Sequence, residues 1–171
     1  MHTNTPPPQT PLTSRREARQ RVWNYIMEMP EVAVGRVRVV AHGKLLGLNS
    51  SSAYRIVKNG ISTKALGPLS DYLGVGKGQV VDYLDLDRTT VNRRAAKDQL
   101  LPMHSAEGVL RLLELDEMAC DTFESEEDAA NWLRRAHPML DGESPLQATK
   151  TWFGTQRAKD ILVAVKYGGV V

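Results

Sequence analysis

The chain has 171 residues, enough for one domain or two small ones, and no apolar run reaches the roughly 18 residues of a membrane span. Its net charge of +2 hides an asymmetry, because residues 1–100 carry 15 Lys/Arg against 8 Asp/Glu, whereas residues 101–171 carry 7 against 12. The basic half suggests a polyanionic partner and the acidic half a different one, although two ordinarily solvated surfaces would give the same counts.

The N-terminal quarter contains a tail, a helix and one ambiguous stretch. Residues 1–14 are rich in Pro and Thr and predict a disordered tail without a signal peptide, so we expect a cytoplasmic protein that contacts no membrane. Residues 15–29 predict a helix with Val22 and Ile26 on its apolar side. The basic residues at its start, Arg15 among them, form either a nucleic-acid contact or a solvated face. Residues 31–41 fit a helix or a strand equally well.

Short helices are expected between residues 53 and 97. Residues 53–59 end at Gly60, and Ser62 caps a segment over residues 63–73 that must bend or restart at Gly67–Pro68. Two further short helices, residues 79–84 and 87–97, are joined by a tight connection.

Residues 80–94 have the pattern of a helix-turn-helix. Apolar residues occupy the positions where the two helices cross, Asp85 stands where a turn usually has Gly, and Asp87 caps the second helix. The second helix offers residue types that bond phosphates and base edges. These residues are Arg88, Thr89, Asn92, Arg93 and Arg94. One such module makes few phosphate contacts, so we expect a homodimer on promoter DNA.

Two other interpretations of this region stay open. One is an ordinary helical hairpin that never contacts DNA. The other is a second candidate module at residues 46–60, with Tyr54, Arg55 and Lys58 exposed.

The C-terminal half predicts a compact helical unit. Ser105 caps a helix through Phe123, and Ser125 caps another that Pro138 stops. Ser144–Pro145 then begins a helix over residues 146–153 with Gly154 after its end, and Thr155 caps a last helix ending near Tyr167. The expected core residues are Trp132, Leu133, Leu146, Ile161 and Leu162. Without pocket-making loops, such a unit typically binds a protein or packs against its own chain.

No local signature of catalysis is present. The four histidines are scattered, Cys120 is the only cysteine and is expected to be a packed thiol, and no nucleophile elbow or metal cluster appears. Gly74, Gly76 and Gly78 resemble a phosphate loop only loosely, because no Lys-Ser/Thr follows. We therefore expect a protein that is not an enzyme and holds neither a cofactor nor a metal.

From about Leu45 to its end, the chain resembles the MbcA/ParS/Xre antitoxin family. The matching pieces keep their order over some 125 residues. They are Leu45–Leu46–Gly47–Leu48, Val57–Lys58–Asn59–Gly60–Ile61, Leu73–Gly74, Thr89–Thr90–Val91–Asn92–Arg93–Arg94, Arg111–Leu112, Ala119, Phe123, Ala129, Trp132–Leu133, Pro138, Leu140–Asp141–Gly142, Ser144–Pro145–Leu146, Thr151, Gly154, Leu162 and Lys166–Tyr167–Gly168. Asp141 departs from a common Gly, and Ala106, Gly108 and Ala158 also differ from the family pattern. The first 44 residues fall outside the resemblance.

The resemblance implies an antitoxin encoded beside a RES-domain toxin that degrades NAD. The helical patterns along the chain predict an all-α fold. We expect residues 15–103 to form an N-terminal helical domain with an Xre-like helix-turn-helix, and residues 104–171 to form a toxin-binding domain. In this family the last residues block the toxin's active site. By position, the blocking segment would be Lys166, Tyr167, Gly168, Gly169, Val170 and Val171. The alternatives are a frayed terminus there, a DNA-binding regulator without a toxin, and a structural adaptor.

Overall fold

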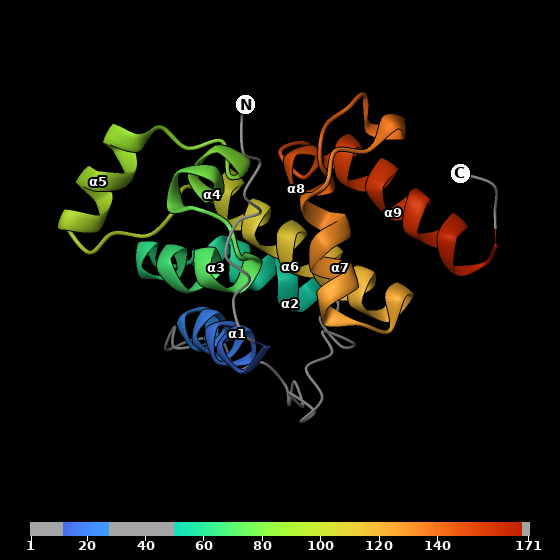
Figure 1. Ribbon diagram of the computed structural model, residues 1–171. Helices are drawn as coiled ribbons and strands as arrows, with labels where there is room; N and C mark the ends of the chain where they lie inside the picture. The colour runs from blue at the N-terminus through green and yellow to red at the C-terminus, as the bar shows by residue number, and fades with distance from the viewer. Residues whose placement is uncertain (1–11, 28–49, 169–171) are drawn as a thin grey trace, which may run out of the picture.

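A computed structural model of the protein describes residues 12–27 and 50–168. Within these ranges the chain is helical and forms no strand, apart from an isolated antiparallel bridge between Ser62 and Leu100 (Figure 1). The predicted all-α fold is therefore confirmed. Residues 1–11 of the expected tail, the ambiguous residues 31–41 and the first resemblance motif at Leu45 lie outside the described residues.

The N-terminal elements are short. They are α1 (Leu12–Met27), α2 (Ser50–Asn59), the 3-10 turn η1 (Thr63–Ala65), α3 (Leu66–Leu73), α4 (Lys77–Tyr83) and α5 (Arg88–Ala96). Helix α1 begins at Leu12, so residues 12–14 belong to a helix and not to the predicted tail. Its residues Ala18, Val22 and Ile26 are buried, and the helix packs against α3.

The restart predicted near Gly67–Pro68 occurs at Leu66. The Ser62 hydroxyl accepts a hydrogen bond from the Lys64 amide at 3.2 Å and begins η1, after which the chain turns into α3. Pro68 lies in the first turn of α3, where its missing N–H removes no helical hydrogen bond. Gly74 ends α3 with φ 62°, a conformation that glycine adopts without strain.

The C-terminal elements surround one long helix. They are α6 (Met103–Phe123), α7 (Glu126–Arg134), the 3-10 turn η2 (Pro138–Leu140), α8 (Pro145–Ala148) and α9 (Trp152–Lys166). The 21 residues of α6 span about 31 Å, and this helix packs against α2, α7 and α9. It therefore joins the two halves of the molecule into one core.

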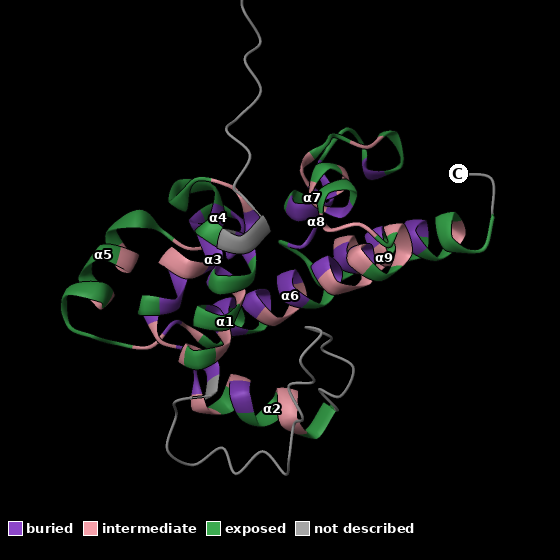
Figure 2. Cartoon of the chain, turned by 60° about the horizontal axis from the view of Figure 1, so that its bottom comes forward, coloured by how far each residue is buried: buried purple, intermediate pink, exposed green. Residues whose placement is uncertain are grey.

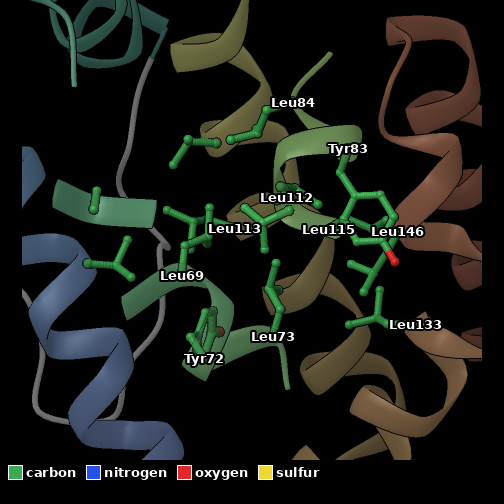
Figure 3. Close-up of a cluster of buried hydrophobic side chains, with 14 of the residues drawn as sticks. Leu69, Tyr72, Leu73, Tyr83, Leu84, Leu112, Leu113, Leu115, Leu133 and Leu146 are labelled. Carbon is green, nitrogen blue, oxygen red and sulfur yellow. The ribbon is translucent and has the colours of Figure 1, made fainter. Parts of the chain in front are cut away.

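The core gathers leucines from both halves. Figure 3 shows Leu112 and Leu113 of α6 next to Leu69 and Leu73 of α3, with Leu133 on the other side, and all five are at most 3% exposed. The expected core residues behave as predicted, except that Trp132 is only partly buried.

The predicted start of α6 is wrong. Pro102, not Ser105, is the N-terminal cap, and Ser105 lies inside the first turn. Its buried hydroxyl donates to the Leu84 carbonyl at 3.0 Å, so it satisfies the last turn of α4 instead of capping its own helix. Among the described helices, none is both long and apolar enough to cross a bilayer.

Helices α5 and α9 lie at opposite ends of the molecule, since both views place them on opposite sides of α6 (Figures 1 and 2). The two surfaces that the sequence singled out, one on α5 and one after α9, are therefore well separated.

Candidate functional site

Helix α7 and the turn after it are held in place by helix caps and by aromatic contacts. The Ser125 hydroxyl accepts from the Asp128 amide at 3.2 Å, as predicted for an N-terminal cap. The Trp132 ring lies between Phe123, at 5.9 Å, and His137, at 6.2 Å between centroids. His137 Nδ1 accepts from the Met139 amide at 3.2 Å and begins η2, so this histidine has a structural role.

Helix α8 is shorter than the sequence predicted. The Ser144 cap is confirmed, with its hydroxyl accepting from the Gln147 amide at 3.3 Å, but the helix ends at Ala148. The Thr149 hydroxyl donates to the Leu146 carbonyl at 2.6 Å, at the point where the chain leaves the axis of α8.

The last helix consequently begins earlier than expected. Thr151, not Thr155, caps α9, and its hydroxyl accepts from the Gly154 amide at 3.0 Å. Gly154 lies in the first turn of α9 and is not a residue after a helix end. A Cβ at Gly154 would lie 2.1 Å from the Ala148 carbonyl oxygen, so only glycine permits this approach of α9 to α8. The earlier start places Trp152 and Phe153 at the head of α9.

Helix α9 has two contrasting faces. Its inner face packs on α6 through buried Ala158, Ile161 and Leu162. Four exposed apolar residues lie away from this inner face by the helical repeat, and we call them the outer face of α9. This outer face consists of Trp152, Phe153, Val163 and Tyr167, which are 59%, 76%, 44% and 79% exposed.

The predicted blocking segment continues from this outer face. Lys166, Tyr167 and Gly168 are exposed, and Lys166 forms an ion pair with Asp121 of α6. Gly168 has φ 73° and ends the described chain. Gly169, Val170 and Val171 lie outside the described residues.

The geometry of residues 80–94 resembles the expected pattern in its turn and cap. Asp85 has φ 52°, the left-handed conformation predicted at the turn, and Asp87 accepts from the Thr90 amide at 2.8 Å. Val80 and Leu84 are buried, whereas Leu86 is only partly buried. None of the residues of α5 is fully buried, and Val91 packs partly buried against the core.

Most of the candidate DNA-binding residues are accessible. Arg88, Thr89, Asn92 and Arg93 are exposed on α5. Arg94 is half-buried and donates to the Leu100 carbonyl at 3.0 Å, so it supports the segment that follows α5. On α2, the alternative site, Tyr54, Arg55 and Lys58 are exposed, and the Lys58 amine lies 5.6 Å from the Tyr54 ring centroid.

Arg15 is not on a solvated or nucleic-acid-binding face, contrary to both sequence interpretations. Its side chain is 7% exposed and forms an ion pair with Asp116 of α6, which is fully buried. Its Nε donates to the Tyr72 carbonyl at 3.2 Å and one terminal nitrogen donates to the Glu126 carbonyl at 3.1 Å. The Tyr72 hydroxyl donates to the second oxygen of Asp116. Arg15 thus connects α1, α3, α6 and α7.

Two titratable groups of this cluster are strongly affected by burial. Burial raises the pKa of the Asp116 carboxyl, while the charge of Arg15 and the hydrogen bond from Tyr72 oppose that rise. Burial raises the pKa of the Cys120 thiol to about 11, and the nearby Asp116 charge adds to the rise. Cys120 is therefore a protonated, weakly reactive thiol at neutral pH, as the sequence suggested. Within the described ranges, no group of His, Cys, Asp and Glu has a metal-binding arrangement.

These surfaces can bind a partner, since they offer exposed aromatic side chains on α9 and exposed basic side chains on α5. The sequence missed Trp152 and Phe153, because it assigned them to the end of the preceding helix. Two aromatic residues directly after a possible Thr cap are the signal that would have predicted their position at the start of α9.

Comparison with known proteins agrees with this description. Residues 118–168 match the family model described as "Antitoxin Xre/MbcA/ParS C-terminal toxin-binding domain". A protein of Sphingobium sp. (strain YBL2), named "Prs ADP-ribosylating antitoxin", is 29% identical over 122 residues, which are 66% of this chain and 77% of that protein. Residues 118–168 are thus similar to the toxin-binding domain of the Xre/MbcA/ParS antitoxins, and much of the chain is similar to one named antitoxin.

Proposed function

We propose that this antitoxin neutralises a RES-domain toxin that consumes NAD, and that it does so by covering the toxin's active site. The observation that carries the proposal is the outer face of α9, which lies inside the toxin-binding domain and leads directly to the predicted blocking segment. The inner face of the same helix is fully used for packing. The outer face is therefore available to another protein.

The amount of apolar surface supports a protein partner. Trp152, Phe153 and Tyr167 are each more than half exposed. Trp152 and Phe153, whose rings are in contact, together expose roughly 270 Å² if a fully exposed aromatic residue contributes about 200 Å². This approaches the size of the largest apolar patch on a typical monomer, which is often an interaction site.

The proposed chemistry of the toxin agrees with the relative's name. ADP-ribosylation takes its ADP-ribose group from NAD by breaking the bond to nicotinamide. A toxin that transfers ADP-ribose and one that simply hydrolyses NAD both consume NAD, so occlusion of one nucleotide cleft would stop either reaction.

Co-expression with the neighbouring toxin gene tests this function. We expect a co-purifying complex in which the toxin consumes no NAD. Removal of residues 167–171 should restore NAD consumption while the complex still forms. A truncated antitoxin that silences the toxin fully would refute the blocking role of this segment, and the absence of any complex would favour a regulator without a toxin.

We also propose that the antitoxin binds its own promoter as a homodimer in the cytoplasm. The observation that favours this second role is α5, which exposes Arg88 and Arg93 with Thr89 and Asn92 between them. Side chains of these types bond phosphates and base edges, and none of these four residues is buried. The separation of α5 from α9 allows DNA and toxin to be bound at the same time (Figure 1).

The test of DNA binding uses Arg88→Ala and Arg93→Ala but leaves Arg94 intact, because Arg94 supports the Leu100 carbonyl. If both arginines contact phosphates, promoter affinity falls and the slope of log K against log salt decreases by about one for each. The matched control also removes two exposed cations, but from α2: Arg55→Ala with Lys58→Ala. If only the α2 variant loses affinity, the DNA-binding surface lies on α2 and not on α5. If the protein shows no salt-sensitive DNA binding, a structural adaptor is favoured.

A further inference from the structure

We propose that Trp152 and Phe153 form an aromatic anchor that supplies most of the affinity for the toxin, separately from the blocking segment at the other end of α9. This inference rests on the proposed function. It divides the toxin-binding surface into a site that holds the partner and a site that stops its reaction.

The two rings are arranged as a preformed contact. They meet edge to face, with centroids 5.0 Å apart and planes at 82°, and they are 59% and 76% exposed. Neither side chain is needed to cover the core, because the inner face of α9 does that through Ala158, Ile161 and Leu162. Rigid, exposed aromatic residues lose little conformational entropy on binding and dominate the affinity of many interfaces.

The backbone under the two rings is held on both sides. Thr151 caps the helix, and the Thr155 hydroxyl donates to the Thr151 carbonyl at 2.8 Å. Arg157 donates to the Met139 carbonyl at 2.6 Å and forms an ion pair with Asp141 at 3.1 Å, which ties the first turns of α9 to η2. The anchor thus stands on a fixed element, as precise recognition requires.

One partner can reach both ends of the outer face. Phe153 and Tyr167 are 14 residues apart, which places them about four turns and roughly 21 Å apart along the same side of α9. A stable protein interface covers about 800 Å² on each partner, equivalent to a disc about 30 Å across. An interface of this size centred between Tyr167 and Phe153 can therefore cover both, and the matched toxin-binding region includes both.

The charges beside the outer face favour an apolar contact over a charge-driven one. Three cations at its margins are already paired within the domain: Arg157 with Asp141, Lys159 with Glu114, and Lys166 with Asp121. The anchor should consequently bind with little dependence on salt. We commit to the toxin as occupant, in preference to a second copy of this chain, because the outer face is continuous with the blocking segment.

The experiment compares three forms of the full chain with the purified toxin. They are Trp152→Ala with Phe153→Ala, the form lacking residues 167–171, and Tyr54→Ala as a control that removes a 64% exposed aromatic residue from α2. Binding is measured by calorimetry, NAD consumption is measured at saturating antitoxin, and thermal unfolding checks that each form is folded.

We expect the anchor variant to raise the Kd at least 30-fold while still silencing the toxin fully at saturation. The shortened form should bind with a Kd within a few-fold of wild type but leave NAD consumption measurable, and Tyr54→Ala should change neither. An anchor variant within threefold of the wild-type Kd would overturn the inference while the proposed function stands. Loss of self-association in that variant without a change in Kd would assign the rings to a second copy. A wild-type chain that binds no toxin would reject the proposed function itself.

Discussion

The buried pair of Arg15 and Asp116 leads to a sharp stability prediction. Replacing Arg15 with Met keeps most of the apolar stem and removes the guanidinium group. The change leaves the Asp116 carboxyl fully buried with the Tyr72 hydroxyl as its main remaining partner. It also removes hydrogen bonds to two backbone carbonyls, those of Tyr72 and Glu126.

The expected loss is large compared with that of a surface ion pair. Breaking a buried pair by removing one partner costs about 3–5 kcal/mol. For a protein of this size, 1 kcal/mol corresponds to about 2–4 °C in Tm, so the Tm of Arg15→Met should fall by about 6–20 °C. Circular dichroism during heating, together with urea unfolding, measures both quantities.

The deficit should also depend on pH in a defined direction. Burial raises the pKa of Asp116 in the folded protein, and Arg15 limits that rise. Without Arg15 the folded variant binds this proton still more tightly than the unfolded chain, whose carboxyl pKa is about 4. The unfolding free energy of the variant therefore falls as pH rises above about 4, up to the folded pKa. Relative to wild type, the deficit is largest at neutral pH and shrinks toward pH 4.

Two controls make this prediction specific. Arg16→Met removes a 79% exposed arginine that lies 3.5 Å from the same Glu126, and it should change stability by no more than about 0.5 kcal/mol. Combining Arg15→Met with Asp116→Leu should recover much of the loss, because no unpaired charge is then buried. If Arg15→Met is within 0.5 kcal/mol of wild type, or if its deficit is the same at pH 4 and pH 7, the described pairing is not what holds α1 in place.

Three further predictions follow from the described contacts. Gly154→Ala should lower the unfolding free energy by about 2–3 kcal/mol, because the new Cβ would meet the Ala148 carbonyl; urea unfolding with no measurable change would contradict the close approach. Thr151→Ala should cost about 1 kcal/mol by removing the cap of α9, and a neutral result in the same assay would return the helix start to Thr155. At pH 7.5 the Cys120 thiol, with its pKa raised to about 11, should react with a maleimide about 100-fold more slowly than free cysteine, and a rate near that of free cysteine would disprove this.

Local signals were the ones that sequence could predict well. Ser125, Ser144 and Asp87 cap the helices that they were expected to cap, because a cap depends on a hydroxyl or carboxylate and an amide three residues away. The left-handed conformation of Asp85 was predictable for the same reason, since the turn allows few other backbone conformations.

The start of α9 was predicted wrongly because two local signals were ambiguous. Thr151 and Thr155 lie four residues apart, and either can cap a helix. Gly154 was interpreted as a residue after a helix end, whereas its real constraint is the Ala148 carbonyl of a neighbouring element. A close approach between two helices leaves no periodic pattern in the sequence, so the exposed position of Trp152 and Phe153 could not be predicted.

The environment of Arg15 was out of reach for a different reason. Its partner Asp116 is 101 residues away, and nothing in either local pattern distinguishes a paired charge from a solvated one. The candidate site residues on α5 were placed correctly as accessible side chains, with the exception of Arg94, whose bond to Leu100 depends on how the chain returns after the helix.

Arg15 also limits how this chain can be recombined with its relatives. A chimaera that joins residues 104–171 to a foreign N-terminal half would import Asp116 without its counter-ion, since Arg15 lies 101 positions upstream in α1. Such hybrids are expected to misfold unless they also inherit α1, or unless Asp116 is exchanged for an apolar side chain. Recombination between related chains would therefore favour exchange of the whole chain over exchange of residues 104–171 alone.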